Sequence, residues 1–273
     1  MSAPAATSFT LEPGFIVAAV VATAVYLRSA RSAAVPGWRR ASFLTGAVLI
    51  AATLNSPLET IAVHYLLLGH LLQNALIADW APPLLLLGLT QEMGENILRR
   101  LGPVSRLLNA GISWPLWVVG WYTIHLTRPY TYALEHPLAL DLEHAFLITI
   151  GLCFWWPVIV PGARRMASGV AVLYLLGAFV AASFLGLAYT FIPTPIYPYY
   201  VHAPRLWGIS AARDQNLGGV LMTAEQSAVF LTAVVLSLLR LMNEEERRND
   251  EQVAAALAQD AARVEAASAG AEE

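Results

Sequence analysis

The feature that most constrains this chain is a series of apolar runs, each long enough to cross a lipid bilayer. A helix that rises about 1.5 Å per residue needs about 20 apolar residues to cross roughly 30 Å of hydrocarbon. Seven such runs lie near 13–28, 41–58, 61–88, 109–127, 143–161, 168–192 and 217–241. Only 13% of the residues are charged, against about 25% in a soluble domain, and the mean hydropathy is +0.57. The sequence therefore predicts an all-α, polytopic membrane bundle of about seven transmembrane helices.

The arginines indicate how these spans are oriented, because short cytoplasmic loops collect positive charge. One side of the predicted bundle carries Arg28, Arg31, Arg39, Arg40, Arg99, Arg100, Arg106, Arg164, Arg165, Arg240, Arg247, Arg248 and Arg263. The other side carries Arg128, Arg205 and Arg213. We therefore expect the N-terminus outside, the C-terminus in the cytoplasm, and a multi-pass location in a bacterial cell membrane, where the lipid bilayer is the first partner.

Composition also sets the domain organisation and excludes several classes of function. Residues 1–243 form the predicted seven-helix transmembrane domain, and residues 244–273 form a charged, Ala/Glu-rich cytoplasmic tail. No basic residue precedes the first apolar run, so we expect that run to be retained and not cleaved as a signal peptide. A net charge of −3 gives no basic surface for nucleic acid, and the single cysteine, Cys153, excludes an intrachain disulfide.

All six histidines map to the outer loops or the outer ends of the predicted spans: His64, His70, His125, His136, His144 and His202. Imidazole is a common ligand of copper and zinc, and a site needs ligands that converge from different helices. We expect His70, His125 and His144 to meet at one depth, with the Glu143 carboxylate available to orient an imidazole. The alternative for each is an interfacial side chain bonded to backbone or water, and His136 and His202 fall in predicted aqueous loops.

Three polar residues, Asp79, Glu225 and Gln226, interrupt the predicted spans. An ionisable group inside a span is by default a functional hypothesis, and one hypothesis here is a transporter or a proton-coupled carrier built around Asp79 and Glu225. The structural alternative for Asp79 is a carboxylate that bonds exposed backbone amides before the proline pair. Against a carrier, the chain has no detectable inverted repeat, and Asp79 precedes Pro82 and Pro83, which predict a bent or broken helix. The chain lacks His-Glu-x-x-His and Gly-x-Ser-x-Gly motifs, so we do not expect an enzyme.

A set of short motifs gives the chain a resemblance to the CtaG-type assembly proteins of bacterial haem-copper cytochrome c oxidase. The motifs are His70-Leu71-Leu72-Gln73-Asn74, Ala81-Pro82-Pro83, His125 with Arg128-Pro129 and Tyr132, His136-Pro137, Glu143-His144, Phe154-Trp155-Trp156-Pro157, Tyr197-Pro198 and Asp214-Gln215-Asn216-Leu217-Gly218-Gly219 to Met222. They cover roughly residues 40–242. The resemblance implies a seven-span protein, not an enzyme, that assists oxidase biogenesis by helping copper, as Cu(I), reach the oxidase subunits at the outer membrane face.

The resemblance also implies metal ligands, because His70, His125, His136 and His144 occupy histidine positions of the family. Two other histidine positions differ, since this chain has Asn74 one helical turn after His70 and Leu140 between His136 and His144. An amide is a poor copper ligand and leucine is none. The alternative hypothesis is therefore an accessory or scaffold subunit of the oxidase that binds no metal.

Overall fold

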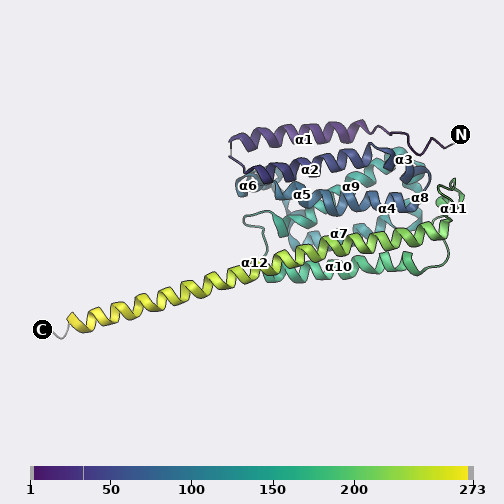
Figure 1. Cartoon of the computed structure of the whole chain (residues 1–273). Coiled ribbons are helices and arrows are strands. Elements are labelled where there is room, and N and C mark those ends of the chain that lie inside the picture. Colours follow the sequence, from purple (N-terminus) through teal and green to yellow (C-terminus); the bar gives the residue numbers. More distant parts are fainter. Residues whose placement is uncertain (1–2, 33, 270–273) are drawn as a thin grey trace.

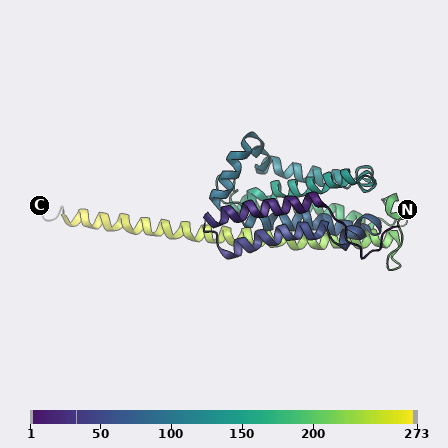
Figure 2. The same cartoon turned by 90° about the horizontal axis from the view of Figure 1, so that it is seen from above.

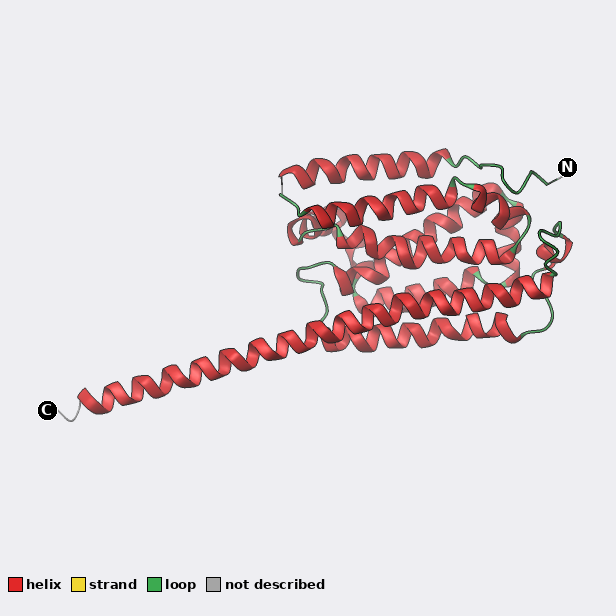
Figure 3. Cartoon of the chain, viewed as in Figure 1, coloured by secondary structure: helices red, strands yellow, loops and turns green. Residues whose placement is uncertain are grey.

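The computed structural model describes residues 3–32 and 34–269, and within these ranges the regular structure is all helical (Figure 3). The long helices are α1 (Pro13–Ser32), α2 (Gly37–Leu54), α7 (Ala110–Ile124), α9 (Pro137–Ile159), α10 (Ser168–Phe191) and α12 (Ala211–Ala269). Shorter elements are α3 (Pro57–His64), α4 (Leu67–Ala75), the π-helix η1 (Leu76–Trp80), α5 (Ala81–Leu87), α6 (Gln91–Leu101), the 3-10 helix η2 (Gly102–Leu108), α8 (Thr127–Glu135) and α11 (Pro198–His202). The all-α prediction is confirmed.

Most of these helices lie side by side along one direction, as a single bundle (Figure 1). Four helices in the described residues are long and apolar enough to cross a membrane: α1, α9, α10 and α12. A fifth span results if α2 and α3, which meet at a 49° bend, are taken together. The chain is therefore a multi-pass membrane protein, whereas α7, with 15 residues, is shorter than a full span, and the series from Leu67 to Leu87 is divided among α4, η1 and α5.

The predicted third span, 61–88, is not one helix. Helix α3 ends at His64, and α4 begins at Leu67. After Ala75 the chain continues as the π-helix η1, at whose end the Ala81 amide donates to the Leu76 carbonyl five residues earlier. Near Pro82 and Pro83 the helix is continuous, because η1 passes directly into α5, and the prolines fall in the first turn of α5, where a missing amide proton costs little. The wider turn of the π-helix lies just before them.

The two ends of the bundle differ in composition. At one end, Arg39 bonds the carbonyls of Leu87 and Leu89 beyond α5, and Arg164 bonds Ser105 of η2. The N-terminal segment lies at the opposite end, together with α3, α8 and α11 (Figure 1). In Figure 2, α12 leaves the bundle at the arginine-rich end and continues alone. It includes the residues of the predicted tail as far as Ala269.

Close approaches between helices fix the position of the polar site described below. A Cβ added to Gly151 of α9 would clash with the carbonyl oxygen of Ala78 in η1. A Cβ on Gly219 of α12 would lie 2.6 Å from the carbonyl oxygen of Gly186 in α10. Small residues at such contacts allow membrane helices to pack backbone to backbone. As a result, α9 is held tightly against the α4–η1–α5 series, and α12 against α10.

Candidate functional site

Three elements bring three histidines into the interior of the bundle. His70 comes from α4, His144 from α9, and His125 from the C-terminal cap of α7. Their exposed fractions are 0%, 1% and 4%. The rings of His70 and His144 have centroids 6.1 Å apart, and the Tyr130 ring of α8 lies 4.7 Å from His70 and 6.0 Å from His125. The structure thus brings the three histidines into one cluster, with Tyr130 between His70 and His125.

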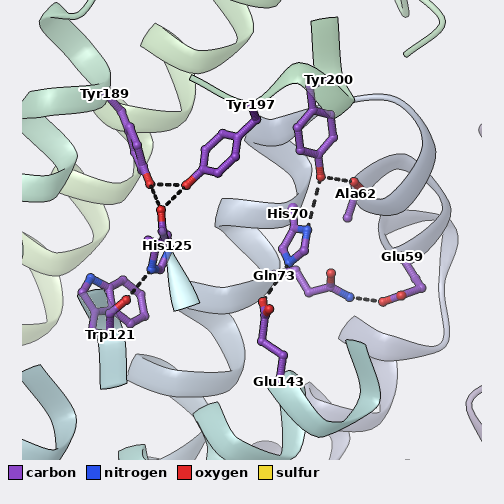
Figure 4. Close-up of polar contacts among 10 residues, drawn as sticks. All are labelled: Glu59, Ala62, His70, Gln73, Trp121, His125, Glu143, Tyr189, Tyr197 and Tyr200. Atoms are coloured by element: carbon purple, nitrogen blue, oxygen red, sulfur yellow. Dashed lines mark hydrogen bonds and ion pairs between the residues drawn. The ribbon is translucent and has the colours of Figure 1, made fainter. Parts of the chain in front are cut away.

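The hydrogen bonds of His70 fix which ring nitrogen is free. The Tyr200 hydroxyl donates its one proton to the Ala62 carbonyl at 2.6 Å, so it can only accept from Nδ1 of His70, 3.2 Å away (Figure 4). Nδ1 therefore carries the ring proton, and Nε2 presents a lone pair. This Nε2 lies 3.5 Å from Oε1 of Glu143. Two acceptors face each other there, so a proton or a metal cation is needed to make the contact favourable.

The hydrogen bonds of His125 fix the same ring tautomer as in His70. Its Nδ1 donates to the Trp121 carbonyl at 2.7 Å, so the opposite nitrogen, Nε2, presents a lone pair. The backbone of His125 is held as well, because the hydroxyls of Tyr189 and Tyr197 both donate to its carbonyl oxygen, at 3.3 and 2.6 Å (Figure 4). The position and the tautomer of this histidine are therefore set by groups from α7, α10 and the loop before α11.

Several polar atoms of the cluster have no hydrogen-bond partner among the described residues. They are Nε2 of His70 and His125, both ring nitrogens of His144, Oε1 of Glu143, both amide atoms of Asn74 and the Tyr130 hydroxyl. Buried polar groups are normally paired, so a concentration of unpaired atoms in one place indicates a bound group, an ion or water. The chemistry of this set, imidazole nitrogens beside a carboxyl, suits a copper or zinc ion.

The residues of the Asp214-Gln215-Asn216 motif position this cluster and do not join it. The Asp214 carboxylate accepts hydrogen bonds from the backbone amides at the start of α4, the helix of His70. Gln215 accepts from the Ile196 amide at 2.7 Å and donates to the Ile192 carbonyl at 3.2 Å. The first turn of α12 thereby fixes both α4 and the loop that carries Tyr197 and Tyr200.

The structure places the other candidate residues outside the cluster. His136 is exposed, stacks on Tyr132 with centroids 4.0 Å apart, and bonds the Tyr132 carbonyl. His64 and His202 line a separate cavity of about 620 Å³ near the N-terminal segment. Met222 is fully buried in the apolar core. Of the four predicted ligands, therefore, His136 is the one that the structure does not bring to the others.

The sequence also left important members of the cluster unrecognised. Tyrosine-rich stretches such as 192–200 ordinarily lie at the surface of the membrane, as interfacial loops. Instead Tyr197 and Tyr200 are 1% and 2% exposed and point to His125 and His70 (Figure 4). This loop departs from the ordinary pattern because the Gln215 side chain bonds its backbone and holds it against the bundle.

The donors approach one another without forming a closed metal site. Within residues 3–32 and 34–259, no three His, Cys, Asp or Glu side chains are grouped closely enough to hold a metal ion. His70 and His144 form the nearest pair, and Asn74 and Glu143 lie next to each other beside them. At most the two imidazoles of His70 and His144 could act together as protein ligands in this arrangement. They do not fit a rigid tetrahedral site.

Comparison with known proteins tests the resemblance seen in the motifs. The family model described as cytochrome c oxidase caa3 assembly factor matches residues 19–244, which confirms the resemblance seen in the motifs. The matched range includes His70, His125, Glu143 and His144. No curated protein and no solved structure gave a match. Since the match extends over most of the 273 residues, this chain belongs to the cytochrome c oxidase caa3 assembly factor family.

Proposed function

We propose that this protein carries Cu(I) as cargo at the outer face of a bacterial cell membrane and presents it to cytochrome c oxidase subunits during assembly. The observation that carries the proposal is the set of unpaired imidazole nitrogens on His70, His125 and His144, buried beside Glu143. The protein acts by binding and release, without catalysing a reaction.

The residues of the cluster have distinct roles in this proposal. Nε2 of His70 and a ring nitrogen of His144 are the first ligands, because these two rings lie closest together. The Glu143 carboxylate, 3.5 Å from Nε2 of His70, offsets the positive charge of the ion. His125 lies beyond Tyr130 and serves as a third ligand or as the next position on the path of the ion. The surrounding tyrosine and tryptophan rings exclude water.

We also propose seven spans, with the N-terminus outside and the C-terminus in the cytoplasm. In this arrangement α7 and the α4–η1–α5 series each cross the membrane as short or broken spans within the bundle. The clustering of Arg39 and Arg164 at the end where α12 leaves the bundle supports it, because cytoplasmic loops collect arginine. Labelling of single cysteines in intact cells tests it, with Cys153→Ser as background. A cysteine at Ala3 should react with a membrane-impermeant maleimide, and one at Asn249 should not.

Complementation tests the function itself. Deletion of the gene should lower oxidase activity and the copper content of the purified oxidase, and the wild-type gene should restore both. A His70→Ala, His144→Ala double variant should be inserted in the membrane at normal levels yet fail to restore copper. Full restoration by this variant would contradict the copper role.

One observation favours a second candidate, an accessory or scaffold subunit that binds no metal. Asn74 and Leu140 occupy positions beside the cluster on the faces that carry His70 and His144, and neither supplies a copper ligand. Under this candidate the double variant would restore the oxidase, and the protein would co-purify with oxidase subunits without metal.

A further inference from the structure

We propose that Asp79 and Glu225 form a carboxyl pair that binds one exchangeable proton inside the bundle, at a site separate from the histidine cluster. Asp79 belongs to the π-helix η1 and Glu225 to α12, so the pair joins two elements that are far apart in the sequence. The proposal does not depend on copper binding.

Burial without partners is the first line of evidence. Asp79 is fully buried, and neither of its carboxyl oxygens has a hydrogen-bond partner among the described residues. Gln226 is also fully buried, faces Asp79, and leaves both of its amide atoms unpaired. Oε2 of Glu225 accepts a 3.0 Å hydrogen bond from the Trp80 indole, while Oε1 is buried and unpaired. Such unpaired groups are rare in proteins and mark places where something binds.

The charge balance is the second line of evidence. Two buried carboxylates repel each other and lose their hydration, so they do not both stay ionised without a counter-charge. Within residues 3–32 and 34–259 the close contacts between a basic and an acidic side chain are His70–Glu143 and Arg240–Glu244, and neither includes Asp79 or Glu225. A single proton removes one negative charge. The protonated carboxyl group also becomes a hydrogen-bond donor, and it can donate to one of the carboxyl oxygens that have no donor in the structure.

The charged groups on the neighbouring elements do not take the place of this proton. Arg40, on the first turn of α2, bonds the Ala30 carbonyl. On α4, His70 points to Glu143. On α12, Arg240 is held by the Ser168 hydroxyl at 2.6 Å and by Glu244. Arg165, which follows α9, lies with Arg240 at the far end of a cavity from Asp79.

That cavity gives the carboxyl pair a connection to the surroundings. It has a volume of about 310 Å³ and is lined by Asp79, Trp80 and Trp155, by apolar residues of α5 and α9, and by α12 from Ala228 to Arg240. The part of α12 that lines the cavity is about 18 Å long, at a rise of about 1.5 Å per residue. The cavity therefore extends from Asp79, one member of the carboxyl pair, to the arginine-rich end of the bundle.

The ligand is a proton and not a metal ion because the donors are too few. Hard cations such as Mg²⁺ and Ca²⁺ take about six or more oxygen ligands. Here Asp79, Glu225 and Gln226 are the polar side chains at the site, and the adjoining cavity walls are largely apolar. A proton needs only one oxygen to carry it and one to accept it.

Labelling with dicyclohexylcarbodiimide tests the proposal on the full-length protein in liposomes. This apolar reagent reacts with protonated carboxyl groups in apolar surroundings, and peptide mass spectrometry locates the product. We expect labelling at Glu225 or Asp79 that decreases as pH rises. In Asp79→Asn, Glu225 loses its negative neighbour, so half-maximal labelling of Glu225 should move at least about one pH unit lower. The reciprocal variant, Glu225→Gln, should move the labelling of Asp79 in the same direction.

Three results would overturn the proposal. They are no labelling of either residue at any pH, an unchanged midpoint in both variants, or protection by Na⁺ or Mg²⁺ at constant pH, which would indicate a metal site. Glu251→Gln is the matched control, because it changes an exposed carboxylate on the part of α12 that extends beyond the bundle and should leave the curve unchanged. Tryptophan fluorescence and gel filtration establish that each variant is folded. If either Asp79→Asn or Glu225→Gln is unfolded, the labelling midpoint of the other variant tests the proposal.

Discussion

The carboxylate of Asp214, in the first turn of α12, accepts a 2.8 Å hydrogen bond from the backbone amide of Leu67, the first residue of α4. Its second oxygen accepts from the Leu68 amide at 2.9 Å. The first amides of a helix have no partner within the helix, and here the partner comes from 146 or more residues away. The start of the helix that carries His70 is therefore tied to the last span.

Loss of this cap should destabilise the protein and weaken the site together. In Asp214→Ala two buried amides lose their acceptor, and we expect a loss of about 1–3 kcal/mol in the free energy of unfolding. Asp214→Asn retains one acceptor oxygen and should lose less. Thermal unfolding in detergent, followed by tryptophan fluorescence, measures both. Asp250→Ala, in the exposed part of α12, should leave the melting temperature unchanged, and equal melting temperatures for Asp214→Ala and the wild type would refute the capping role.

A histidine in place of Asn74 should strengthen copper binding. Asn74 lies one turn after His70, is fully buried, and leaves both amide atoms unpaired next to Glu143. An imidazole there adds a nitrogen ligand on the same helix face. We expect at least about tenfold tighter Cu(I) binding, which corresponds to about 1.4 kcal/mol, as measured by competition with a chromophoric chelator. Asn249→His in the exposed part of α12 is the control, and equal gains in both variants would show that the effect is not local.

The Tyr200 hydroxyl should tune the affinity without being a ligand. It fixes the His70 tautomer by accepting from Nδ1 while donating to Ala62. Such supporting groups typically contribute about 10–100-fold to metal affinity, so Tyr200→Phe should weaken Cu(I) binding by roughly tenfold. Tyr132→Phe removes an exposed hydroxyl outside the cluster and should have no effect. Undiminished affinity in Tyr200→Phe would mean that the tautomer is set in another way.

The contribution of Glu12 to the free energy of unfolding should decrease as pH rises. Partial burial, followed by the neighbouring Asp141 carboxylate, raises the pKa of Glu12 from its ordinary value of 4.5. The folded state therefore favours the protonated form, and this contribution is complete below the ordinary pKa and is lost as pH rises through the raised one. Because Glu12 is only partly buried and solvent screens its charge, we expect this contribution to be less than about 1 kcal/mol.

Glu12→Gln isolates this effect, since it removes the ionisation and keeps the shape. Between pH 4 and pH 8 the wild type should lose more thermal stability than the variant does. Parallel stability curves for the two proteins would show that Glu12 does not contribute. The test depends only on the local charge at the start of α1, and copper is left out of the buffer.

The sequence predicted the helical class and the residues of the histidine cluster better than it predicted their surroundings. Apolar runs and histidine positions follow from residue type, and His70 and His144 do meet. The inward turn of Tyr197 and Tyr200 depends on bonds from Gln215, which a periodicity argument does not contain. The π-helix before Pro82 and the cap on α4 were also missed, because both depend on tertiary packing.

The measurement that tests the central claim most directly is the Cu(I) stoichiometry and affinity of the detergent-purified protein under reducing conditions. The wild type should bind about one Cu(I) per chain, and a His70→Ala, His125→Ala, His144→Ala triple variant should bind none while remaining folded. A His136→Ala, His202→Ala variant should bind as the wild type does, because those side chains lie outside the cluster. Absence of copper from the wild type, or its retention by the triple variant, would contradict the copper site.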